Sequence, residues 1–393
     1  MATRRGHGDG SIYERTVGGK LQIVGIVSLG RDGNGKRIRR AVHGATRAEV
    51  RTKLKEIQRN AEAGLSVGRE TPTVGEWLSK WLEQLEAKNK RYGTLRRYSS
   101  LVRGHLIPGL GGHRLDKLTR VHVDDFLSGK LRELSPRTVY HLRAVLRTAL
   151  NRAVKDGRIL RNAAALTDPV TVPEAPRRFL STDEARAIIE TAEREANAKP
   201  EAERFLTAQR HTLYVLALHI GPRIGEALAL RWQDVDLTTG KLAIVYNLQR
   251  VRGKLDPTVE PKTPKSRRKV TLPPSALQAL QDHQGSQRRE KLRHRPLWQD
   301  SDLIFTSQIG SPLDPNDVSR DFRAFLERNE LPAVRFHDLR HAAGSIMLKN
   351  RVPMHVVSRI LGHSTIATTV NIYGHVETEA LDEAAAAMGL ALG

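Results

Sequence analysis

Two histidines and an arginine lie close together in the stretch RFHDLRHAAGSIML, residues 335–348. His337, Arg340 and His341 would share one face of a helix, because residues three and four apart lie side by side there. Histidines four apart can bind zinc, but the glutamate of the H-E-x-x-H pattern is absent and the chain has no cysteine. A fixed cation between the imidazoles also disfavours a dication. We therefore predict no metal and favour a clamp for an anion.

Further residues of suitable chemistry follow along the second half of the chain. Arg223 comes directly after a Gly-Pro break, at a predicted helix start where free backbone N–H groups favour anions. Lys262 lies in a predicted turn between two strands, His363 in ILGHSTIATT and Tyr373 in TTVNIYGHV. Arginine contacts two phosphate oxygens at once, and a phenol can attack phosphorus if another group takes its proton. These residue types together indicate phosphoryl transfer.

Each residue alone has an ordinary structural explanation. An arginine at a helix start is usually a surface residue. A histidine on a helix face is usually a satisfied structural side chain, and a tyrosine among small polar residues usually packs. Only the complete set, in this order and spacing, indicates a functional site.

As a set, the motifs resemble those of the tyrosine recombinases, specifically the integrases of phages and integrative elements. The matching strings are GPRIGEALALRWQDVD, PKTPKSRRKVTL, FHDLRHAAGSIML and LGHSTIATTVNIYGHV. The resemblance covers nearly the whole chain. It implies a site-specific DNA recombinase that cleaves and rejoins DNA through a 3′-phosphotyrosyl intermediate, to integrate or excise a mobile element or phage genome. It also implies that the reaction needs no cofactor, neither ATP nor a metal.

The resemblance assigns the central chemical steps to four residues. Arg223 and Arg340 match the two arginines that clamp the scissile phosphate, and Tyr373 matches the nucleophile. Lys262 matches the lysine of the family's β-turn and would protonate the leaving 5′-oxygen. Because Lys262 has other basic residues beside it, simple contact with DNA is the alternative role.

The remaining matched positions would support these steps. His337 would take or return the tyrosine proton, and His363 would hydrogen-bond a phosphate oxygen. Glu226 fills an acidic position three residues after the first arginine and would orient its neighbours. His341 has no invariant role in the family pattern, so we expect it to be supporting or structural. Pro222 departs from the family, which usually has a bulky apolar residue there; this could alter the helix start but keeps the charge.

The charge balance indicates a polyanionic partner. The 393 residues carry 65 Lys and Arg against 43 Asp and Glu, a formal net charge of +22. Residues 1–60 carry a net +9 and residues 61–180 a net +10, whereas residues 181–393 carry only +3. Such an excess is typical of nucleic-acid binding. We expect the first half of the chain to hold DNA and the second half to place its cations selectively.

Other compositional features exclude several classes of protein. The absence of cysteine excludes disulfides and thiolate catalysis. No apolar run reaches the roughly 20 residues of a membrane span. The N-terminus MATRRGHGDGS lacks the apolar stretch of a signal peptide. We therefore expect a cytoplasmic, DNA-associated protein without a membrane partner.

Hydrophobic periodicity predicts an α+β, multidomain protein. Residues 1–66 read as a small three-stranded β-sheet plus a helix, and residues 70–163 as an all-α domain of four or five helices. Residues 164–178 contain three prolines and read as a linker. Residues 179–393 are predicted to be mainly α, with a small antiparallel sheet and a tail helix over 377–390. The strands of this sheet are predicted in the stretches KLAIVYNLQRVRG and SRRKVTL.

The resemblance gives each domain a partner. The first domain would bind arm sites on double-stranded DNA, the second would bind core sites, and the third would be the catalytic domain. The protein would act as a homo-tetramer on DNA. We expect the tail helix to dock onto the next protomer, and docking onto its own domain is the alternative. A DNA-bending host protein and an excisionase are the further partners that the resemblance suggests.

Two other functions are compatible with the same fold. A DNA-binding regulator or architectural protein would keep the fold but lose the cutting, and the intact set of site residues argues against it. A relaxing topoisomerase would share the chemistry, and the separate front domain argues against it. A covalent adduct with DNA separates recombinase from regulator, and strand exchange between two duplexes separates recombinase from topoisomerase.

Overall fold

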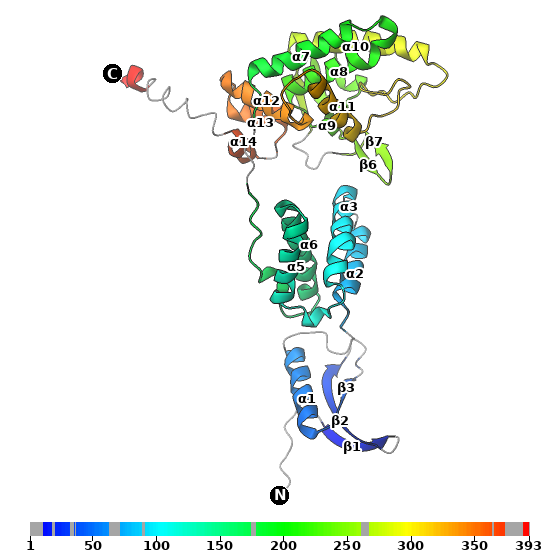
Figure 1. Cartoon of the computed structure of the whole chain (residues 1–393), viewed down its shortest axis with the longest axis vertical. Coiled ribbons are helices and arrows are strands. Elements are labelled where there is room, and N and C mark those ends of the chain that lie inside the picture. Colours follow the sequence, from blue (N-terminus) through cyan, green and yellow to red (C-terminus); the bar gives the residue numbers. More distant parts are fainter. Residues whose placement is uncertain are drawn as a thin grey trace. The chain divides into compact units, whose positions relative to one another are not determined.

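The computed structural model forms two compact units, Met1–Ala175 and Pro176–Gly393. Each is described by itself (Figure 1). The residues that the structure describes are 11–17, 20–31, 35, 37–62, 71–88, 91–173, 178–260, 267–363, 365–373 and 388–392.

The first unit begins with an antiparallel sheet and one helix, as predicted. These elements are β1 (Ser11–Val17), β2 (Lys20–Arg31), β3 (Arg37–Gly44) and α1 (Arg47–Glu62), with strand order β1-β2-β3. Ile23 and Val27 of β2 pack against Val50 and Leu54 of α1 and form a small core of their own. Gly25 permits the close approach of helix to sheet, because a Cβ there would lie 2.5 Å from Val50 Cγ1.

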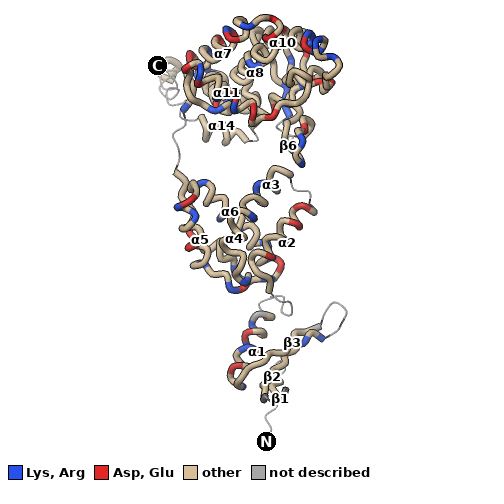
Figure 2. The backbone as a smooth tube through the Cα atoms, turned by 45° about the vertical axis from the view of Figure 1, so that its right-hand side comes forward, with Lys and Arg blue, Asp and Glu red and all other residues tan. Residues whose placement is uncertain are grey.

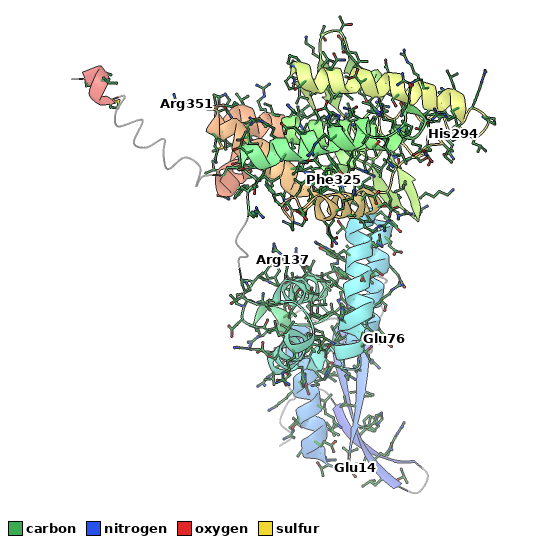
Figure 3. The ribbon with its side chains drawn as sticks, turned by 45° about the horizontal axis from the view of Figure 1, so that its top comes forward. Glu14, Glu76, Arg137, His294, Phe325 and Arg351 are labelled. Carbon is green, nitrogen blue, oxygen red and sulfur yellow. The ribbon has the colours of Figure 1, made fainter. Side chains whose placement is uncertain are left out.

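A helical bundle follows in the same unit. Its helices are α2 (Val74–Ala87), α3 (Tyr92–Leu101), α4 (Ile107–Leu110), α5 (Arg120–Glu133) and α6 (Pro136–Lys155). Glu76 lies in the first turn of α2 (Figure 3). It forms a capping box with Thr73: Thr73 N donates to Glu76 Oε2 at 2.8 Å, and Thr73 Oγ1 accepts from Glu76 N at 3.2 Å. Trp77 is buried and donates to the Ala149 carbonyl at 3.0 Å, so it is a core residue rather than a stacking platform.

The first residues of the expected linker pack against this bundle. Ala164 is fully buried, and the buried Arg143 donates from Nε to Thr167 Oγ1 at 2.7 Å. A short 3₁₀ turn, Ala163–Ala165, precedes this contact. The stretch 164–167 is therefore structurally continuous with the bundle.

The second unit is mainly helical with a small antiparallel sheet. Its helices are α7 (Thr182–Asn197), α8 (Phe205–Ile220), α9 (Ile224–Ala227), α10 (Pro274–Arg293), α11 (Pro315–Arg328), α12 (Phe336–Lys349), α13 (Met354–Leu361) and α14 (Ile366–Tyr373). Its strands are β4 (Val235–Asp236), β5 (Lys241–Ile244), β6 (Gln249–Val251), β7 (Lys254–Asp256) and β8 (Arg268–Thr271). Together with the front sheet and the bundle, this confirms the predicted α+β class.

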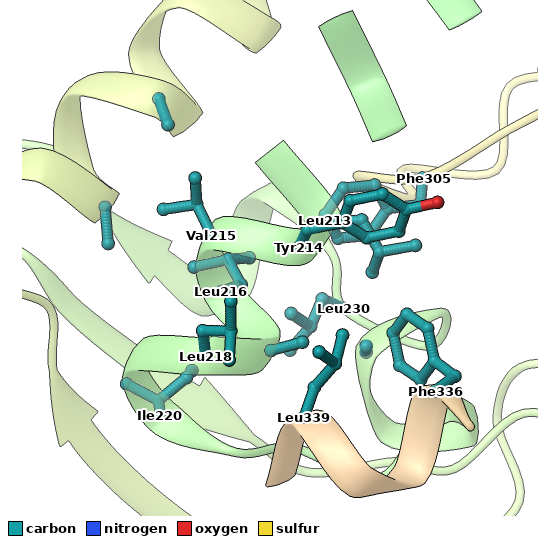
Figure 4. Packing of buried hydrophobic residues seen from close by; sticks show 14 of the residues in the cluster. Leu213, Tyr214, Val215, Leu216, Leu218, Ile220, Leu230, Phe305, Phe336 and Leu339 are labelled. Atoms are coloured by element: carbon teal, nitrogen blue, oxygen red, sulfur yellow. The ribbon is translucent and has the colours of Figure 1, made fainter. Parts of the chain in front are cut away.

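Helix α8 lies at the centre of this unit. Leu216 and Ile220 of α8 are buried, and so are Phe336 and Leu339 of α12 (Figure 4). Tyr214, also on α8, contacts the rings of α11 and α12. This packing fixes the end of α8 and the start of α12, the two places where the arginines of the candidate site lie.

Two local predictions in this unit need correction. The helix expected after the Gly-Pro break is only the single turn α9. The stretch predicted as one strand, KLAIVYNLQRVRG, divides into β5, which pairs with β4 and β8, and β6, which pairs with β7. The division arises because Leu248 N donates to the Gly225 carbonyl at 2.7 Å, which draws the chain out of the sheet to support α9.

Two predictions fall largely outside the described residues. Lys262 lies outside them, in the connection between β7 and β8. Of the predicted tail helix, 377–390, only its last three residues are described; they belong to a helical stretch, 388–392, whose side chains are exposed. No helix in the described ranges is long and apolar enough to cross a membrane.

Candidate active site

Arg223 is held by the carboxylate of Glu226 in the single turn of α9. Arg223 N donates to Glu226 Oε2 at 3.0 Å, and Arg223 Nη1 donates to Glu226 Oε1 at 2.7 Å. The Glu226 side chain is 3% exposed, whereas that of Arg223 is 41% exposed. Glu226 therefore orients Arg223 while leaving part of its guanidinium open to a ligand. Because α9 has four residues, the charge here comes from the side chain and only weakly from a helix dipole.

Arg340 lies on α12 beside the end of α8. It is buried, and its Nη1 donates to the Gly221 carbonyl at 2.6 Å. Its Nη2 is buried with no hydrogen-bond partner among the described residues. Burial, and then repulsion from Arg223, lowers the pKa of the Arg340 guanidinium to about 9. A buried donor without a partner is costly, so an anion oxygen at Nη2 would both satisfy the donor and relieve the repulsion.

Two histidines lie close to these arginines. Burial, and then His341, lowers the pKa of His337 to about 4. Burial, and then Arg340, lowers the pKa of His363 to about 4. His363 follows the left-handed Gly362 (φ 67°), and its Nδ1 lies 2.7 Å from Thr369 Oγ1. Both imidazoles are therefore neutral at pH 7, so each offers one N–H and one acceptor nitrogen.

Tyr373, the last residue of α14, is buried beside α12. Its side chain belongs to a small cluster with Val357 and Leu361 of α13 and is 0% exposed. The hydroxyl Oη lies 3.3 Å from His341 Nδ1. His341 was expected to be supporting or structural, and the structure gives it this specific contact.

The structure thus brings five of the predicted site residues close together, namely Arg223, Glu226, His337, Arg340 and His363, and places Tyr373 near Arg340. Among the described residues, no group of three His, Asp or Glu could hold a metal ion. A cavity of about 740 Å³ opens next to His363, and its lining includes Arg267, Arg268, Lys269 and Arg359. The two arginines are suited to holding one anionic group of a polyanion, and the basic cavity is suited to holding the neighbouring anionic groups of the same polyanion.

Arg268 is a further component that the sequence reasoning missed. In the sequence, Arg268 is one of the basic residues beside Lys262. In the structure its side chain is 6% exposed, and its Nη2 donates to Glu226 Oε2 at 2.9 Å. Its Nε donates to the Ile360 carbonyl of α13 at 2.6 Å. A signal was present in the sequence, because Arg268, Val270 and Leu272 are two residues apart along an extended segment and therefore share one face, which the two apolar side chains mark as the buried one.

The pair between Arg268 and Glu226 joins three parts of the site. Burial raises the pKa of the Glu226 carboxyl, but Arg268 and then Arg223 outweigh it and hold that pKa below its usual value. The carboxylate is therefore ionised, and two guanidiniums share it. Through Ile360, Arg268 also braces the helix that leads to His363.

Arg268→Met should destabilise the second unit strongly. The methionine keeps the apolar stem but leaves the buried Glu226 carboxylate with Arg223 alone, and breaking a buried pair typically costs about 3 kcal/mol or more. The neighbouring Arg267 is 48% exposed, so Arg267→Met is a matched control with an expected loss under about 1 kcal/mol. Denaturant unfolding measures the loss of unfolding free energy in both variants. Equal losses would show that the buried pair of Arg268 and Glu226 stabilises the unit no more than an exposed pair does.

A tyrosine beside two arginines and two neutral histidines, on this helical fold, defines the class of the tyrosine recombinases. Residues 178–380 match the Phage integrase family, and residues 73–131 match the N-terminal SAM-like domain of phage integrases. The chain belongs to the phage integrase family. It is a tyrosine recombinase, an enzyme of site-specific DNA recombination, as the sequence predicted.

The similar proteins support this assignment over nearly the full length. An integrase of Streptomyces ambofaciens is 31% identical over 386 residues, which cover 95% of this chain and 94% of the relative. A XerC-like tyrosine recombinase of Caldanaerobacter subterraneus subsp. tengcongensis is 28% identical over 371 residues, covering 91% and 93%.

Solved structures show the same fold. The Tn1549 transposon integrase in complex with transposon right end DNA has a TM-score of 0.65 at 21% identity, covering 81% of this chain and 98% of that chain. The lambda integrase tetramer bound to a Holliday junction has a TM-score of 0.56 at 21% identity, covering 90% and 95%.

Proposed function

We propose that the chain is an integrase in which Tyr373 attacks a DNA phosphate held by Arg223 and Arg340. The observation that carries this assignment is the buried Nη2 of Arg340, which has no hydrogen-bond partner among the described residues. The next residue in sequence, His341, contacts the Tyr373 hydroxyl. A non-bridging phosphate oxygen fits the Nη2 donor. The same phosphate would then lie close to the phenol.

The proposed step is an in-line displacement at phosphorus. The bond from Tyr373 Oη to phosphorus forms, and the bond from phosphorus to the 5′-oxygen breaks. The phenol proton passes to a neighbouring base, and the leaving 5′-oxygen receives a proton from Lys262. Arg223 and Arg340 stabilise the charge that develops on the phosphoryl oxygens. The 3′-phosphotyrosyl bond conserves the phosphodiester energy, so the reverse reaction rejoins the strand without ATP.

His337 and His363 have different proposed roles. The neutral His337 is available as a proton acceptor for the tyrosine, as predicted from the family pattern. His363, with Nδ1 engaged by Thr369, would turn its other ring nitrogen to a phosphate oxygen. Both roles fit imidazoles that are uncharged at neutral pH.

Double-stranded DNA is the proposed partner of both units. The solved Tn1549 and lambda integrases are complexes with DNA, and the lambda protein is a tetramer on a Holliday junction. In the first unit, Lys and Arg lie along α3 and α6, which carry no acidic residue (Figure 2). We propose core-site binding by residues 70–163, catalysis by residues 179–393 and a homo-tetramer with trans-docked tails. Because residues 164–167 of the predicted linker, 164–178, pack against the bundle, we propose that the linker begins after Thr167. A DNA-bending host protein and an excisionase complete the proposed partners of a cytoplasmic, DNA-associated enzyme.

Deleting residues 1–66 should abolish binding to arm sites while cleavage of a core site persists. Residues 1–60 carry a net +9, and the outward-facing side chains of β3 include Arg37 and Arg39. The small core beneath the sheet is formed by the three front strands and α1, and the bundle has a separate core, so deletion leaves the core of the bundle intact. Gel retardation on separate arm and core duplexes measures the effect. Undiminished arm-site retardation by the shortened chain would place arm binding elsewhere.

Lys262→Ala should lose cleavage of ordinary DNA and regain it on a 5′-bridging phosphorothioate. The sulfur leaving group departs with little help from an acid, so this substrate restores cleavage only to a variant that has lost the general acid. Lys269, an exposed cation of β8, provides a control, because a pure DNA contact should not be rescued by sulfur. If sulfur fails to restore cleavage to Lys262→Ala, Lys262 serves DNA binding and another group is the acid.

Strand exchange distinguishes recombination from relaxation. The chain is incubated with two linear duplexes that carry its attachment sites, and separately with supercoiled plasmid that lacks them. An integrase should yield recombinant duplexes and leave the plasmid supercoiled. Relaxation of the plasmid without any recombinant product would favour a topoisomerase.

A further inference from the structure

The phenol of Tyr373 rests directly on the backbone of α12. A Cβ placed on Gly344 would lie 2.6 Å from both the Tyr373 Cζ and its hydroxyl oxygen. Such a separation is far below van der Waals contact, and the clashing atoms belong to a buried ring rather than to a flexible chain end. The ring can occupy this position only because residue 344 has no side chain.

Gly344 has no conformational reason to be glycine. It lies inside α12, where glycine costs about 1 kcal/mol relative to alanine. It is also absent from the glycines of positive φ. Space for the tyrosine ring is the remaining explanation of its presence.

His341 completes the position of the ring at its polar end. Its Nδ1 lies 3.3 Å from the Tyr373 hydroxyl. The imidazole is itself placed by two rings, Phe179 at 6.3 Å and His337 at 5.0 Å between centroids, both edge-on. The hydroxyl is therefore directed by a group with a fixed orientation.

The same helix carries the arginine that would hold the phosphate. Arg340 and Gly344 are four residues apart on α12, so they share a face. Both rest on neighbouring structure: Gly221 lies against Arg340, and Leu361 lies 3.1 Å from the position of a Cβ on Gly344. One rigid helix thus sets the position of the clamp and of the nucleophile together.

We propose that His341 and Gly344 form a tyrosine seat, a pair of positions on α12 that fixes the Tyr373 ring and hydroxyl against the helix that carries Arg340. The proposal rests on the proposed function of Tyr373 as nucleophile. Gly344 is a positioning residue through the space it leaves, and His341 positions the hydroxyl through Nδ1. Misplacing a nucleophile by about 1 Å can cost roughly 100-fold in rate, and a methyl group at residue 344 forces a displacement of that order.

The first test compares two glycines that lie inside helices. Gly344→Ala should lower the single-turnover rate of covalent adduct formation about 100-fold at saturating DNA, with the DNA dissociation constant changed less than about threefold. Gly285→Ala is the matched control. Gly285 lies inside α10, and a Cβ there meets only Arg289 Nη1 at 3.6 Å. Both changes improve helix propensity equally, so a difference between them reports the seat.

The second test separates the hydrogen bond from the packing of His341. Asparagine can place a hydrogen-bonding atom near the position of Nδ1, whereas leucine fills the space without one. His341→Asn should retain most of the adduct rate, and His341→Leu should lose about 10-fold or more, a loss on the scale of one hydrogen bond. If thermal unfolding shows that Gly344→Ala is misfolded, the comparison of His341→Asn with His341→Leu tests the seat on its own.

The possible failures are distinguishable. A wild-type chain that forms no adduct on any duplex overturns the proposed function of Tyr373. Normal wild-type adduct with Gly344→Ala as fast as Gly285→Ala overturns the seat alone. Equal rates for His341→Leu and His341→Asn would likewise remove His341 from it.

Discussion

Tyr373→Phe should form no covalent adduct with DNA, while the fold and DNA binding persist. The phenylalanine ring fills the same buried space over Gly344, and the change removes one oxygen, which lies 3.3 Å from His341 Nδ1. Since that oxygen is the proposed nucleophile, the expected loss of adduct is complete. Denaturing gels of a nicked core duplex measure the adduct, and gel retardation measures binding.

Tyr246→Phe is the matched control for this result. From the sequence, Tyr246 is the alternative nucleophile to Tyr373. In the structure it follows β5, and the Arg231 guanidinium lies 4.5 Å from its ring centroid. Its removal should leave adduct formation unchanged. Adduct formation by Tyr373→Phe at the wild-type rate would assign the nucleophile to another residue.

Arg340→Lys should lower the rate of cleavage about 1000-fold, an effect typical of removing a preorganised donor from a transition state. Lysine keeps one positive charge, but it cannot bind the Gly221 carbonyl and a phosphate oxygen with the fixed fork of a guanidinium. Binding of the DNA as a whole should change little, because many other cations contact the backbone. Single-turnover cleavage of a nicked substrate at saturating enzyme measures the chemical step.

Arg335→Lys provides the control on the same helix. Its side chain is 79% exposed and pairs with Asp338, at the start of α12. The exchange should leave cleavage within a few-fold of wild type. If the changes at Arg340 and Arg335 have equal effects, general charge and not the buried donor governs the reaction.

Features encoded by local sequence were predictable. Glycine-rich sequence, at residues 18–19 and in RDGNGK, marks where the front strands β1 and β2 end, and exposed and partly buried residues alternate along β3. The caps of α6 and α7 follow from Ser135 before Pro136 and from Ser181 with Glu184 three residues on, and the structure has both. The positions of Arg223 and Arg340 followed from the motifs that carry the family resemblance, and the structure places these two arginines close together. Their catalytic roles, with those of the other site residues, stay predictions.

Features that depend on contacts distant in sequence could not be predicted. Arg268 and Glu226 are 42 residues apart, and His341 and Tyr373 are 32 apart. Local polarity made Arg268 look like a surface cation, since nothing near it in sequence shows the carboxylate that receives it. The division of the strand at 245–248 likewise depends on Gly225, which accepts from Leu248 only in the folded unit.

Covalent trapping on DNA tests the central claim most directly. The full chain is incubated, with EDTA and without ATP, with nicked duplexes that tile the DNA flanking its own coding region. Adducts are digested with protease, and mass spectrometry identifies the amino acid that carries the nucleotide. We expect an adduct on a small set of tiles, joined through a 3′-phosphate to Tyr373. An adduct at another residue, a requirement for a metal, or no adduct on any tile would contradict the assignment of this chain as an integrase that uses Tyr373.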